Sequence, residues 1–340
     1  MKCIVCKAPN ELQMREDAMP QRGEGQALVR IRRIGICGTD LHAYRGRQPF
    51  FVYPRVLGHE LCVELVEADS DDPQLKPGTP LVVMPYISCG HCIACRRGRP
   101  NCCTQVVVLG VHEDGGMREY MSLPLSCLVP ADGLELEQMA LVECLSIGAH
   151  AVDRAAVEPG ETALVIGGGP IGIGVMQFAR IAGARVIAMD INKDRLAYCK
   201  DTIGVDETIH TESVDDPAAA LAELTNGDLP TVVIDATGSP DSMIAAFNYV
   251  ASSGRYVLVS IVQADISFYD PEFHRREIAL LSSRNARREH FTQVIDALRR
   301  GDIETQTFVT HRVPFDDVIE AYPSWLKPET GVIKAMVELG

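Results

Sequence analysis

The sequence predicts an α/β protein of two domains, in which a β-rich domain is combined with a doubly wound parallel sheet. Three observations support this fold class. The chain has 340 residues, which is more than one hydrophobic core usually holds. Its first half consists of short strand-like segments between Gly, Pro and Asp turns, whereas strands and helical segments alternate from Thr162 onward. The strand-and-turn pattern returns at Val309, so the α/β part is predicted to be an insertion in the β-rich domain.

The elements of the β-rich half are short. Residues 27–34 and 61–67 are its clearest strand predictions, and we expect strand-and-turn structure up to about Val142. The spacing of apolar residues then changes to that of a helix, which is expected over residues 143–156. The β-rich half therefore ends near the start of this helix.

The elements of the α/β part alternate in type. Four short β-branched runs are predicted strands, and helix-length amphipathic segments follow the first three of them. The runs are residues 162–166, 185–189, 232–236 and 256–260. Because strands and helices alternate, the sheet is expected to be parallel. A last helix is expected over residues 287–300, where two arginines precede Gly301 and suit a helix C-terminus.

These patterns set the expected domain boundaries. Residues 1–147 together with residues 288–340 are assigned to the β-rich domain, and residues 148–287 to the α/β domain. The tail after Val309 is expected to pack back onto the first half.

The composition is that of an ordinary globular protein. Hydrophobic residues make up 46% and charged residues 23%, which excludes a disordered or collagen-like chain. A net charge of −14 opposes binding to a polyanion, so we expect no nucleic-acid partner. The longest uncharged stretch, residues 162–179, contains five glycines and a proline, which suits a buried strand, turn and helix better than a membrane span. The expected partner is therefore a small molecule.

Twelve cysteines are present, and their interpretation depends on the compartment. Residues 1–14 lack the basic region and following apolar region of a secretory leader. We therefore expect a cytoplasmic protein. In a reducing compartment, clustered cysteines are more often metal ligands or reactive thiols than disulfides.

A glycine motif lies between the first α/β strand and a helix expected over residues 171–181. Gly167, Gly169 and Gly172 form G-x-G-x-x-G, in which the glycines allow a tight turn, close approach of a pyrophosphate and close helix packing. Asp190 ends the next strand, where a carboxylate accepts hydrogen bonds from ribose hydroxyls and repels a 2′-phosphate. The carboxylate therefore favours NAD over NADP. The position of the motif between a strand and a helix favours cofactor binding over a turn that serves packing alone. Further expected cofactor contacts are Pro170, Ile171, Arg195 and Thr237.

A second motif has the spacing C-x2-C-x2-C-x7-C. Its cysteines are Cys89, Cys92, Cys95 and Cys103, with Gly90 and Gly98 at the sharp turns. Four thiolates with no open position describe a structural tetrahedral zinc site. A ferredoxin-type iron–sulfur cluster has a different final spacing followed by proline, and the net charge opposes a zinc ribbon that binds nucleic acid. Cys102 adjoins the last cysteine, so either residue can be the fourth ligand.

Further metal ligands lie in G-I-C-G-T-D-L-H, which contains Cys37, and in His59 and Glu60 after Gly58. Thiolate, imidazole and carboxylate are zinc ligands, and three protein ligands leave a position for water or substrate. Taken singly, such residues are commonly buried apolar thiols or surface groups. Glu143 lies between two apolar stretches, where a nearby cation would offset the cost of a buried carboxylate.

Together these motifs resemble the zinc-containing medium-chain alcohol and polyol dehydrogenases across nearly the whole chain. The resemblance implies a GroES-like catalytic domain, a Rossmann NAD-binding domain, one catalytic zinc and one structural zinc. Cys37, His59 and Glu60 would bind the catalytic zinc, and Glu143 would be an alternative ligand or a carboxylate behind it. The family spacing selects Cys103 as the fourth structural ligand.

Two departures from the family pattern lie near the catalytic zinc. Cys144 stands where the family usually has proline, and Val63 replaces a common glycine. The choice between Glu60 and Glu143 as inner ligand therefore stays open, and a non-enzymatic NAD or zinc sensor remains an alternative to the enzyme.

A narrower resemblance is to the branch of L-galactonate and L-gulonate 5-dehydrogenases. It is carried by residues 48–60, 110–116, 270–274 and 283–285. It implies oxidation of a C6 sugar acid at carbon 5 to a ketouronate, while a neutral polyol or L-threonine is the alternative substrate.

The implied chemistry assigns roles to five further residues. Zinc would lower the pKa of the substrate hydroxyl from about 16 toward roughly 7, so that hydride can leave carbon for the nicotinamide. Thr39 and His42 would carry the released proton outward. His112, His274 and Arg284 are the candidates for binding the substrate carboxylate.

The family also implies a homodimer or homotetramer. Residues 256–262 and 266–268 are expected to offer the sheet edge for such an assembly.

Overall fold

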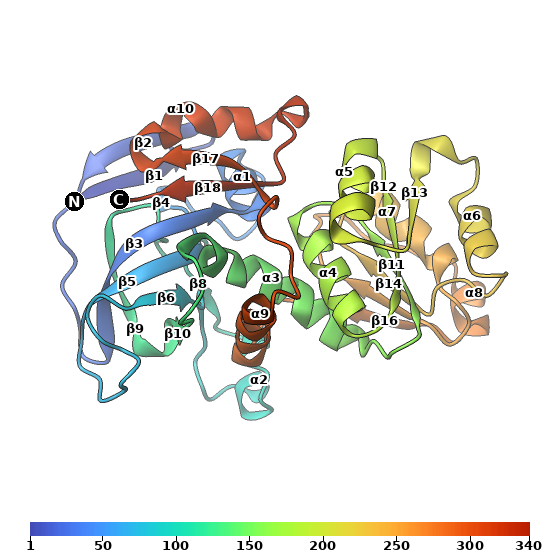
Figure 1. The fold of residues 1–340 in the computed structure, drawn as a ribbon, viewed down its shortest axis with the longest axis horizontal. Helices are drawn as coiled ribbons and strands as arrows, with labels where there is room; N and C mark the ends of the chain where they lie inside the picture. Colours follow the sequence, from blue (N-terminus) through green and yellow to red (C-terminus); the bar gives the residue numbers. More distant parts are fainter. The chain divides into compact units, whose positions relative to one another are not determined.

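The computed structural model describes all 340 residues, and they form two compact units. Unit 1 contains Met1–Cys144, Arg287–Gly301 and Thr305–Gly340, and unit 2 contains Leu145–Ala286 and Asp302–Glu304 (Figure 1). Unit 1 is β-rich and unit 2 has a parallel sheet with helices, which confirms the predicted fold class. None of the helices has both the length and the apolar character that crossing a membrane requires.

The main sheet of unit 1 has the strand order β10-β6-β5-β3-β18-β17, and β9 also pairs with β3. Its strands are β3 (Gln26–Ile36), β5 (Glu60–Ala68), β6 (Pro80–Val83), β9 (Tyr120–Pro124), β10 (Leu128–Pro130), β17 (Val309–Pro314) and β18 (Lys334–Glu338). β3 forms because apolar residues alternate with polar ones, so that Ala27, Val29 and Ile31 are all buried. β18 pairs antiparallel with β3, so the C-terminal tail returns to the first half as predicted.

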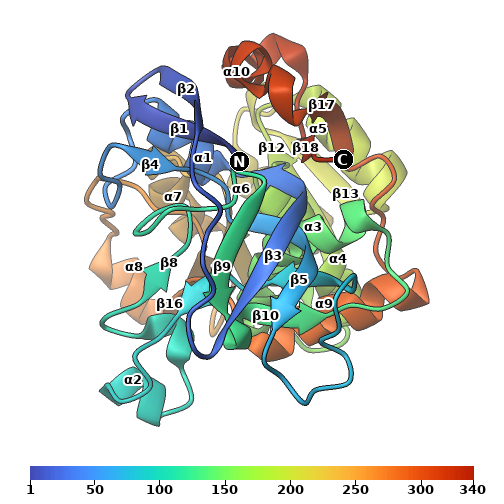
Figure 2. The ribbon, with the colours of Figure 1, turned by 90° about the vertical axis from the view of Figure 1, so that its left-hand side faces the viewer.

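Two smaller sheets complete the strands of unit 1. One has the order β2-β1-β4 and the other pairs β7 with β8. Their strands are β1 (Lys2–Ala8), β2 (Glu11–Glu16), β4 (Arg55–Val56), β7 (Tyr86–Ile87) and β8 (Val107–Val108). Figure 2 shows β9, β3 and β5 next to one another in the main sheet.

Four α-helices lie wholly in unit 1: α1 (Gly38–Tyr44), α2 (Ile93–Arg96), α9 (Arg288–Arg300) and α10 (Val318–Ala321). α9 ends at Gly301, whose φ of 74° is the left-handed conformation typical of a helix C-terminus, as predicted. α3 (Leu136–Ala155) crosses the division between the units. It begins before residue 143, so the expected strand-and-turn structure up to Val142 is wrong over 136–142. Two polar residues, Glu137 and Gln138, are followed here by four buried apolar residues, 139–142, so this short segment shows no helical period.

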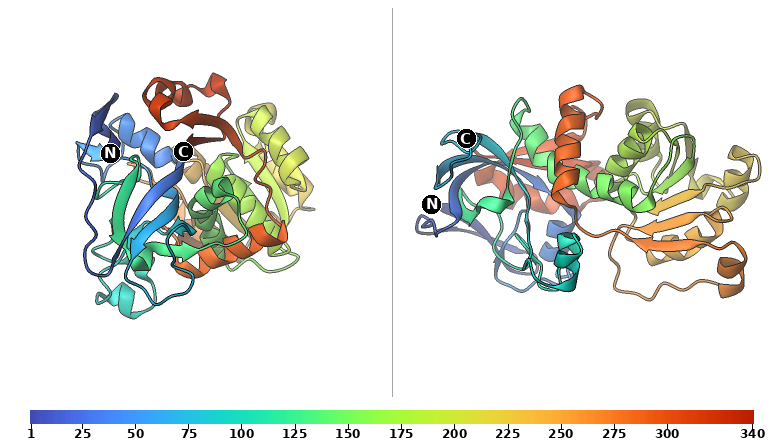
Figure 3. Two further views of the ribbon diagram at one scale, coloured as in Figure 1. Left: turned by 60° about the vertical axis from the view of Figure 1, so that its left-hand side comes forward. Right: turned by 90° about the horizontal axis from the view of Figure 1, so that it is seen from below.

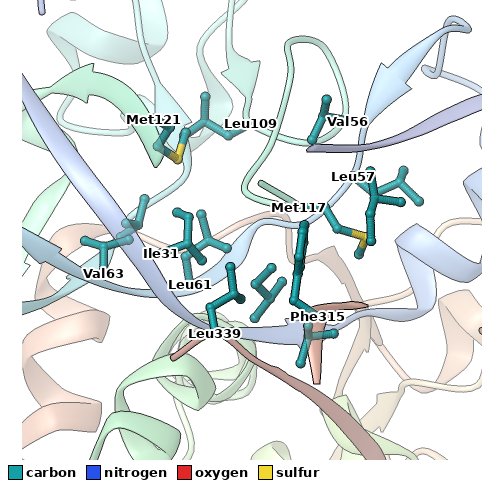
Figure 4. Packing of buried hydrophobic residues seen from close by; sticks show 14 of the residues in the cluster. Ile31, Val56, Leu57, Leu61, Val63, Leu109, Met117, Met121, Phe315 and Leu339 are labelled. Atoms are coloured by element: carbon teal, nitrogen blue, oxygen red, sulfur yellow. The ribbon is translucent and has the colours of Figure 1, made fainter. Parts of the chain in front are cut away.

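The core of unit 1 fills the space beside its main sheet. Figure 4 shows Ile31 of β3, Leu61 and Val63 of β5, and Phe315 within this cluster. Ile31 and Val63 are fully buried. Dense packing makes these strands a rigid frame for the residues at their ends.

Unit 2 contains a six-stranded parallel sheet of order β13-β12-β11-β14-β15-β16. The strands are β11 (Thr162–Ile166), β12 (Arg185–Asp190), β13 (Glu207–His210), β14 (Val232–Asp235), β15 (Arg255–Leu258) and β16 (Ala279–Ser282). The helices are α4 (Pro170–Ile181), α5 (Lys193–Tyr198), α6 (Pro217–Leu224), α7 (Pro240–Ala245) and α8 (Asp270–Arg275). Figure 3 shows helices on both faces of this sheet, as a doubly wound fold requires.

The expected sheet edge is corrected by this strand order. β15 pairs with β14 on one side and β16 on the other, so residues 256–258 are interior to the sheet. The edges of the sheet are β13 and β16, two strands that the sequence pattern did not reveal, and β16 is the one that adds beyond β15. It was missed because three of its four residues are exposed and show no buried strand pattern.

Candidate active site

Cys37, His59 and Glu60 converge at one end of the unit 1 sheet. Cys37 immediately precedes α1, and Glu60 is the first residue of β5. The ligand atoms of the three residues all lie within 4.8 Å of one another. Gly35 of β3 pairs with Glu60, and a Cβ at Gly35 would stand 2.1 Å from Glu60 Oε2, so the carboxylate needs a glycine opposite it. This geometry matches the expected three-ligand cluster.

The donors in this cluster fit zinc. Sulfur, nitrogen and oxygen are the atoms that zinc takes from proteins. His59 is buried, and its Nδ1 lies 3.6 Å from Asp40 Oδ1 without forming a hydrogen bond. Burial lowers the pKa of His59, but nearby Asp40 and Cys37 raise it, and the net pKa lies well above its ordinary value. The cluster therefore has room and electrostatic demand for a cation.

Asp40 is a partner of His59 that the sequence analysis did not identify. Its Oδ1 lies 3.6 Å from His59 Nδ1, and its two oxygens accept from the backbone amides of Cys37 at 3.0 Å and Gly58 at 3.1 Å. Burial raises the pKa of Asp40, but His59 and these amides lower it below its ordinary value. An anion behind a ligating histidine fixes the ring and raises its basicity. The signal was the aspartate of the G-T-D-L-H segment itself.

Lys334 is a second partner that the sequence analysis missed. Its Nζ donates to both carboxylate oxygens of Glu60 at 2.7 Å and to the carbonyl of Ile36 at 3.2 Å. Both charged side chains are buried, at 1% and 0% exposure. Burial lowers the pKa of Lys334, but Cys144 and Glu60 raise it, and the net pKa is above its ordinary value. No local motif could reveal a pair separated by 274 residues.

Glu143 is buried in α3, as expected, and the hydroxyl of Tyr86 donates to its Oε1. Burial raises the pKa of Glu143 to about 7; His59 acts in the opposite direction, and Glu60 raises it further. Glu143 is not among the three residues whose ligand atoms lie within 4.8 Å. Its role as an alternative ligand therefore stays a prediction.

Thr39 and His42 lie on α1, three residues apart and therefore on one face of the helix. His42 is exposed and Thr39 is half-buried. Partial burial of its ring, together with Arg45 and Arg47, lowers the pKa of His42. A neutral imidazole at neutral pH can accept a proton, so the geometry is compatible with the predicted relay.

The four-cysteine loop brings its expected ligands together. The sulfur atoms of Cys89, Cys92, Cys95 and Cys103 lie within 4.8 Å of one another. Cys103 is buried and its sulfur accepts from the amides of Cys89 and Gln105, each at 3.3 Å, whereas Cys102 is exposed.

The pKa shifts of this loop differ between its thiols. Backbone amides of Cys95 and Thr104 lower the pKa of Cys92 to about 5, whereas burial and the neighbouring Cys92 and Cys103 raise the pKa of Cys95 to about 11. Thiolates held by amide donors are suited to a structural zinc ion.

The glycine loop of unit 2 has the backbone that a dinucleotide site requires. Gly167 has a φ of 104°, and a Cβ at Gly172 would stand 1.8 Å from the Gly167 carbonyl oxygen. α4 begins at Pro170, directly after the loop, with Ile171 in its first turn. Gly169 is the N-cap residue, and a Cβ there would meet no atom within 4 Å, which leaves its outer side open. The loop therefore presents backbone amides at a helix N-terminus.

Asp190 and Arg195 both lie against this loop. Asp190 Oδ2 accepts from the Gly168 amide at 2.5 Å, and its Oδ1 accepts from the Asn192 amide at 2.7 Å. Arg195 Nη1 lies 3.5 Å from the Gly168 carbonyl oxygen. Burial lowers the pKa of Arg195, and Asp190 acts in the opposite direction. Both side chains are thus beside the segment that the pyrophosphate is predicted to contact.

Thr237 is held by a buried residue that the sequence analysis missed. Asp235 ends β14 and is fully buried. Its Oδ1 accepts from the Thr237 amide at 2.9 Å and from the Thr237 hydroxyl at 2.7 Å, and its Oδ2 accepts from the Ser242 hydroxyl at 2.6 Å. A Cβ at Gly167 would stand 3.3 Å from the Thr237 nitrogen, so this turn supports the glycine loop.

The three carboxylate-binding candidates are not brought into one cluster within either unit. His112 lies in unit 1, its ring 6.3 Å from that of Phe50, and its Nδ1 accepts from the Val108 amide at 3.0 Å. His274 and Arg284 lie in unit 2, and both are exposed. Their roles stay predictions.

Known protein families match most of the chain. The model for the zinc-binding dehydrogenase family matches residues 170–300, and that for the alcohol dehydrogenase GroES-like domain matches residues 23–133. L-Galactonate-5-dehydrogenase of Escherichia coli (strain K12) is 40% identical over 337 residues, which cover 99% of this chain and 98% of that protein. L-Idonate 5-dehydrogenase of Vitis vinifera is 31% identical over 89% of this chain and 86% of its own length.

Solved structures show the same architecture. An alcohol dehydrogenase (rspB) of Escherichia coli CFT073, complexed with NADH, has a TM-score of 0.93 at 30% identity, with 100% of this chain and 99% of that chain covered. The 2R,3R-butanediol dehydrogenase of Bacillus subtilis has a TM-score of 0.90 at 27% identity, with 100% and 99% covered. Both similarities extend over the two units.

Proposed function

Because this chain belongs to the zinc-binding alcohol dehydrogenase family, we propose that it oxidises the C5 hydroxyl of L-galactonate or L-gulonate with NAD as hydride acceptor. The chain is an NAD-dependent oxidoreductase that acts on a CH–OH group. The observation that carries the sugar-acid substrate is the 40% identity to an L-galactonate-5-dehydrogenase along 99% of the chain. Relatives named L-arabinitol 4-dehydrogenase favour a neutral polyol as the second candidate, before L-threonine.

The metal would be held by this chain's own donors. Cys37, His59 and Glu60 would bind the catalytic zinc, and the four cysteines of the loop would bind the structural zinc. When bound, zinc acts as a Lewis acid that stabilises negative charge on the substrate oxygen. Asp40 places a negative charge 3.6 Å from His59 Nδ1, and Lys334 holds the Glu60 carboxylate in place at 2.7 Å.

Proton and cofactor handling would use separate parts of the chain. Thr39 and His42 would carry the substrate proton from the neighbourhood of Cys37 along one face of α1. The glycine loop and the first turn of α4, residues 167–172, would hold the pyrophosphate, and Asp190 would accept hydrogen bonds from the ribose hydroxyls.

The assay that tests the proposal is absorbance at 340 nm with NAD and a panel of aldonates and polyols, before and after chelation. We expect turnover with L-galactonate or L-gulonate, and its loss when zinc is removed. Turnover with neutral polyols alone would select the second candidate. Absence of turnover with every substrate would favour the non-enzymatic NAD or zinc sensor.

Cofactor choice has its own measurement. Asp190 repels a 2′-phosphate, so a fluorescence titration should show tighter binding of NADH than of NADPH. Equal affinity would remove Asp190 from this role.

Recognition of the carboxylate is assigned to His112, His274 and Arg284. Arg284→Gln is expected to raise KM for an aldonate far more than for a neutral polyol, because a guanidinium pairs with a carboxylate through two parallel hydrogen bonds. An equal effect on both substrates would reject the role.

Assembly and location complete the proposal. The family favours a homodimer or homotetramer. The twelve cysteines, all free thiols in the structure, support a cytoplasmic location.

A further inference from the structure

Glu143, the expected alternative metal ligand, forms a buried pair with Tyr86, a residue that belongs to none of the zinc or dinucleotide motifs. Tyr86 is the first residue of β7 and pairs with Val108 of β8. Its ring packs edge-on against Phe291 of α9, with centroids 6.3 Å apart and an interplanar angle of 80°. Backbone pairing and ring packing together fix where the hydroxyl lies, and that hydroxyl donates to Glu143 Oε1.

Electrostatic interactions connect this pair with the three-ligand cluster. Burial raises the pKa of Glu143, His59 lowers it and Glu60 raises it; burial and Glu143 raise the pKa of Tyr86, and Cys37 and Glu60 raise it further. Every one of these residues belongs to unit 1. The Tyr86 hydroxyl therefore donates a hydrogen bond to a carboxylate whose pKa the predicted metal ligands His59 and Glu60 shift.

The two carboxylates of the site are held in different ways. Both oxygens of Glu60 accept from the Lys334 ammonium at 2.7 Å, so its orientation is fixed at two points by an opposite charge. Glu143 is held at Oε1 by an uncharged hydroxyl. A carboxylate anchored at one oxygen can turn about its side-chain bonds when that hydrogen bond is lost.

We propose that Tyr86 is a positioning residue of the metal centre, whose hydroxyl fixes the orientation of Glu143 beside the Cys37–His59–Glu60 cluster. The inference rests on the proposed function, since it requires a metal ion in that cluster. Removal of a group that hydrogen-bonds to residues around a metal site usually lowers metal affinity or activity by about 10-fold to 100-fold. Tyr86→Phe removes the hydroxyl while the ring that packs on Phe291 stays.

The test replaces zinc by Co²⁺ in the full-length protein and compares the native chain with Tyr86→Phe. We expect changed visible absorption bands of Co²⁺ and loss of the metal to a chelator about 10-fold faster or more. The four-cysteine site is the same in both proteins, so its contribution cancels in the difference spectrum. Tyr44→Phe is the matched control, because the buried Tyr44 donates to the Asn10 carbonyl at 3.1 Å in the same unit, and it should keep the native spectrum and rate.

A native Co²⁺ spectrum and chelation rate in Tyr86→Phe, with only a lower midpoint of thermal unfolding, would overturn the proposal, because a packing role predicts that result. Tyr86→Phe should also cause no further spectral change in a Glu143→Gln background, and additive changes would contradict the inference. The aldonate assay is independent. A native protein that binds Co²⁺ in the cluster but oxidises no aldonate refutes the proposed substrate and leaves this test intact.

Discussion

The carboxylate of Glu60 shows how one buried charge determines the residues around it. Gly35 makes room for the side chain, and Lys334 supplies the opposite charge through two hydrogen bonds of 2.7 Å. Asp40 places an opposite charge 3.6 Å from His59 without a hydrogen bond, and its own charge is stabilised by two backbone amides. Buried charges persist only when they are paired and hydrogen-bonded, so these partners are part of the site although they need not touch the substrate.

Lys334→Met should destabilise the metal-free protein strongly. The substitution leaves the Glu60 carboxylate buried without its counter-charge, and breaking a buried pair in this way costs about 3–5 kcal/mol. Urea unfolding followed by circular dichroism measures the loss. Lys2→Met removes the exposed pair with Asp316 and should change the curve little. Equal changes in the two variants would show that the buried pair contributes no more than a surface pair.

His42 should determine the acidic limb of the pH profile. Partial burial and the two nearby arginines lower its pKa, so His42 stays neutral until the pH falls below the ordinary value of 6.5. kcat/KM should then decline as the imidazole becomes protonated and can no longer accept a proton. His42→Gln should lower kcat/KM on the order of 100-fold and remove this limb. His91→Gln, at an exposed position of the four-cysteine loop, should leave both kcat/KM and the limb unchanged. An unchanged limb in His42→Gln would reject the relay.

At the scale of elements, the chemistry lies where strands and helices begin or end. α1 begins directly after Cys37, β5 begins at Glu60, and α4 begins directly after the glycine loop. Element ends leave backbone amides unpaired, and those amides hold charged groups such as Asp40 and Asp190. β14 follows the same rule, since its last residue, Asp235, anchors the turn that supports the glycine loop.

Asp235→Asn should weaken NADH binding. An amide in place of the carboxylate cannot accept all three hydrogen bonds from Thr237 and Ser242 with the same strength, so the turn behind Gly167 should loosen. We expect the dissociation constant for NADH to rise about tenfold, which corresponds to 1.4 kcal/mol. Asp206→Asn removes a carboxylate that accepts from the Val186 amide elsewhere in unit 2 and should affect stability only. Equal NADH affinities in native protein and Asp235→Asn would contradict the role.

At the scale of the whole molecule, unit 1 is built from segments at both ends of the chain. Residues 305–340 add β17 and β18 to a sheet whose other strands precede Cys144, and with them comes Lys334. The Glu60 carboxylate is therefore paired with Lys334 only when the tail has returned to the sheet. The parallel sheet of unit 2 ends at β16, where Leu280 is 39% exposed.

Leu280→Glu should weaken self-association. An exposed edge strand with an apolar side chain is suited to pairing with a second copy, and charges that face each other across a two-fold axis repel. Sedimentation should show a dissociation constant raised by at least about tenfold. Ile181→Glu is the matched control, because Ile181 is also 39% exposed but lies at the end of α4. A native association constant in Leu280→Glu would exclude β16 as the interface.

Much of the fold could be predicted because its signals are local. β11 has the predicted bounds, and α9 ends at the predicted Gly301, since apolar period and turn residues determine both. β16 and the first two turns of α3 were not predicted, because neither has a clear periodic pattern over its own length. In the site, too, only local signals could be read from the sequence. Spacing identified the cysteine loop and the glycine loop, because the members of each lie within a few residues of one another.

The sequence by itself determined the fold class and predicted the two zinc ligand sets and the dinucleotide loop, because these motifs depend on residue types at short, fixed separations. Only the tertiary structure decided which side chains stabilise those ligands. Lys334 reaches Glu60 across 274 residues, and Tyr86 reaches Glu143 across 57. Strand pairing and helix packing bring these segments together, and the resulting hydrogen bonds offset the cost of burying the charged groups, which no local pattern records.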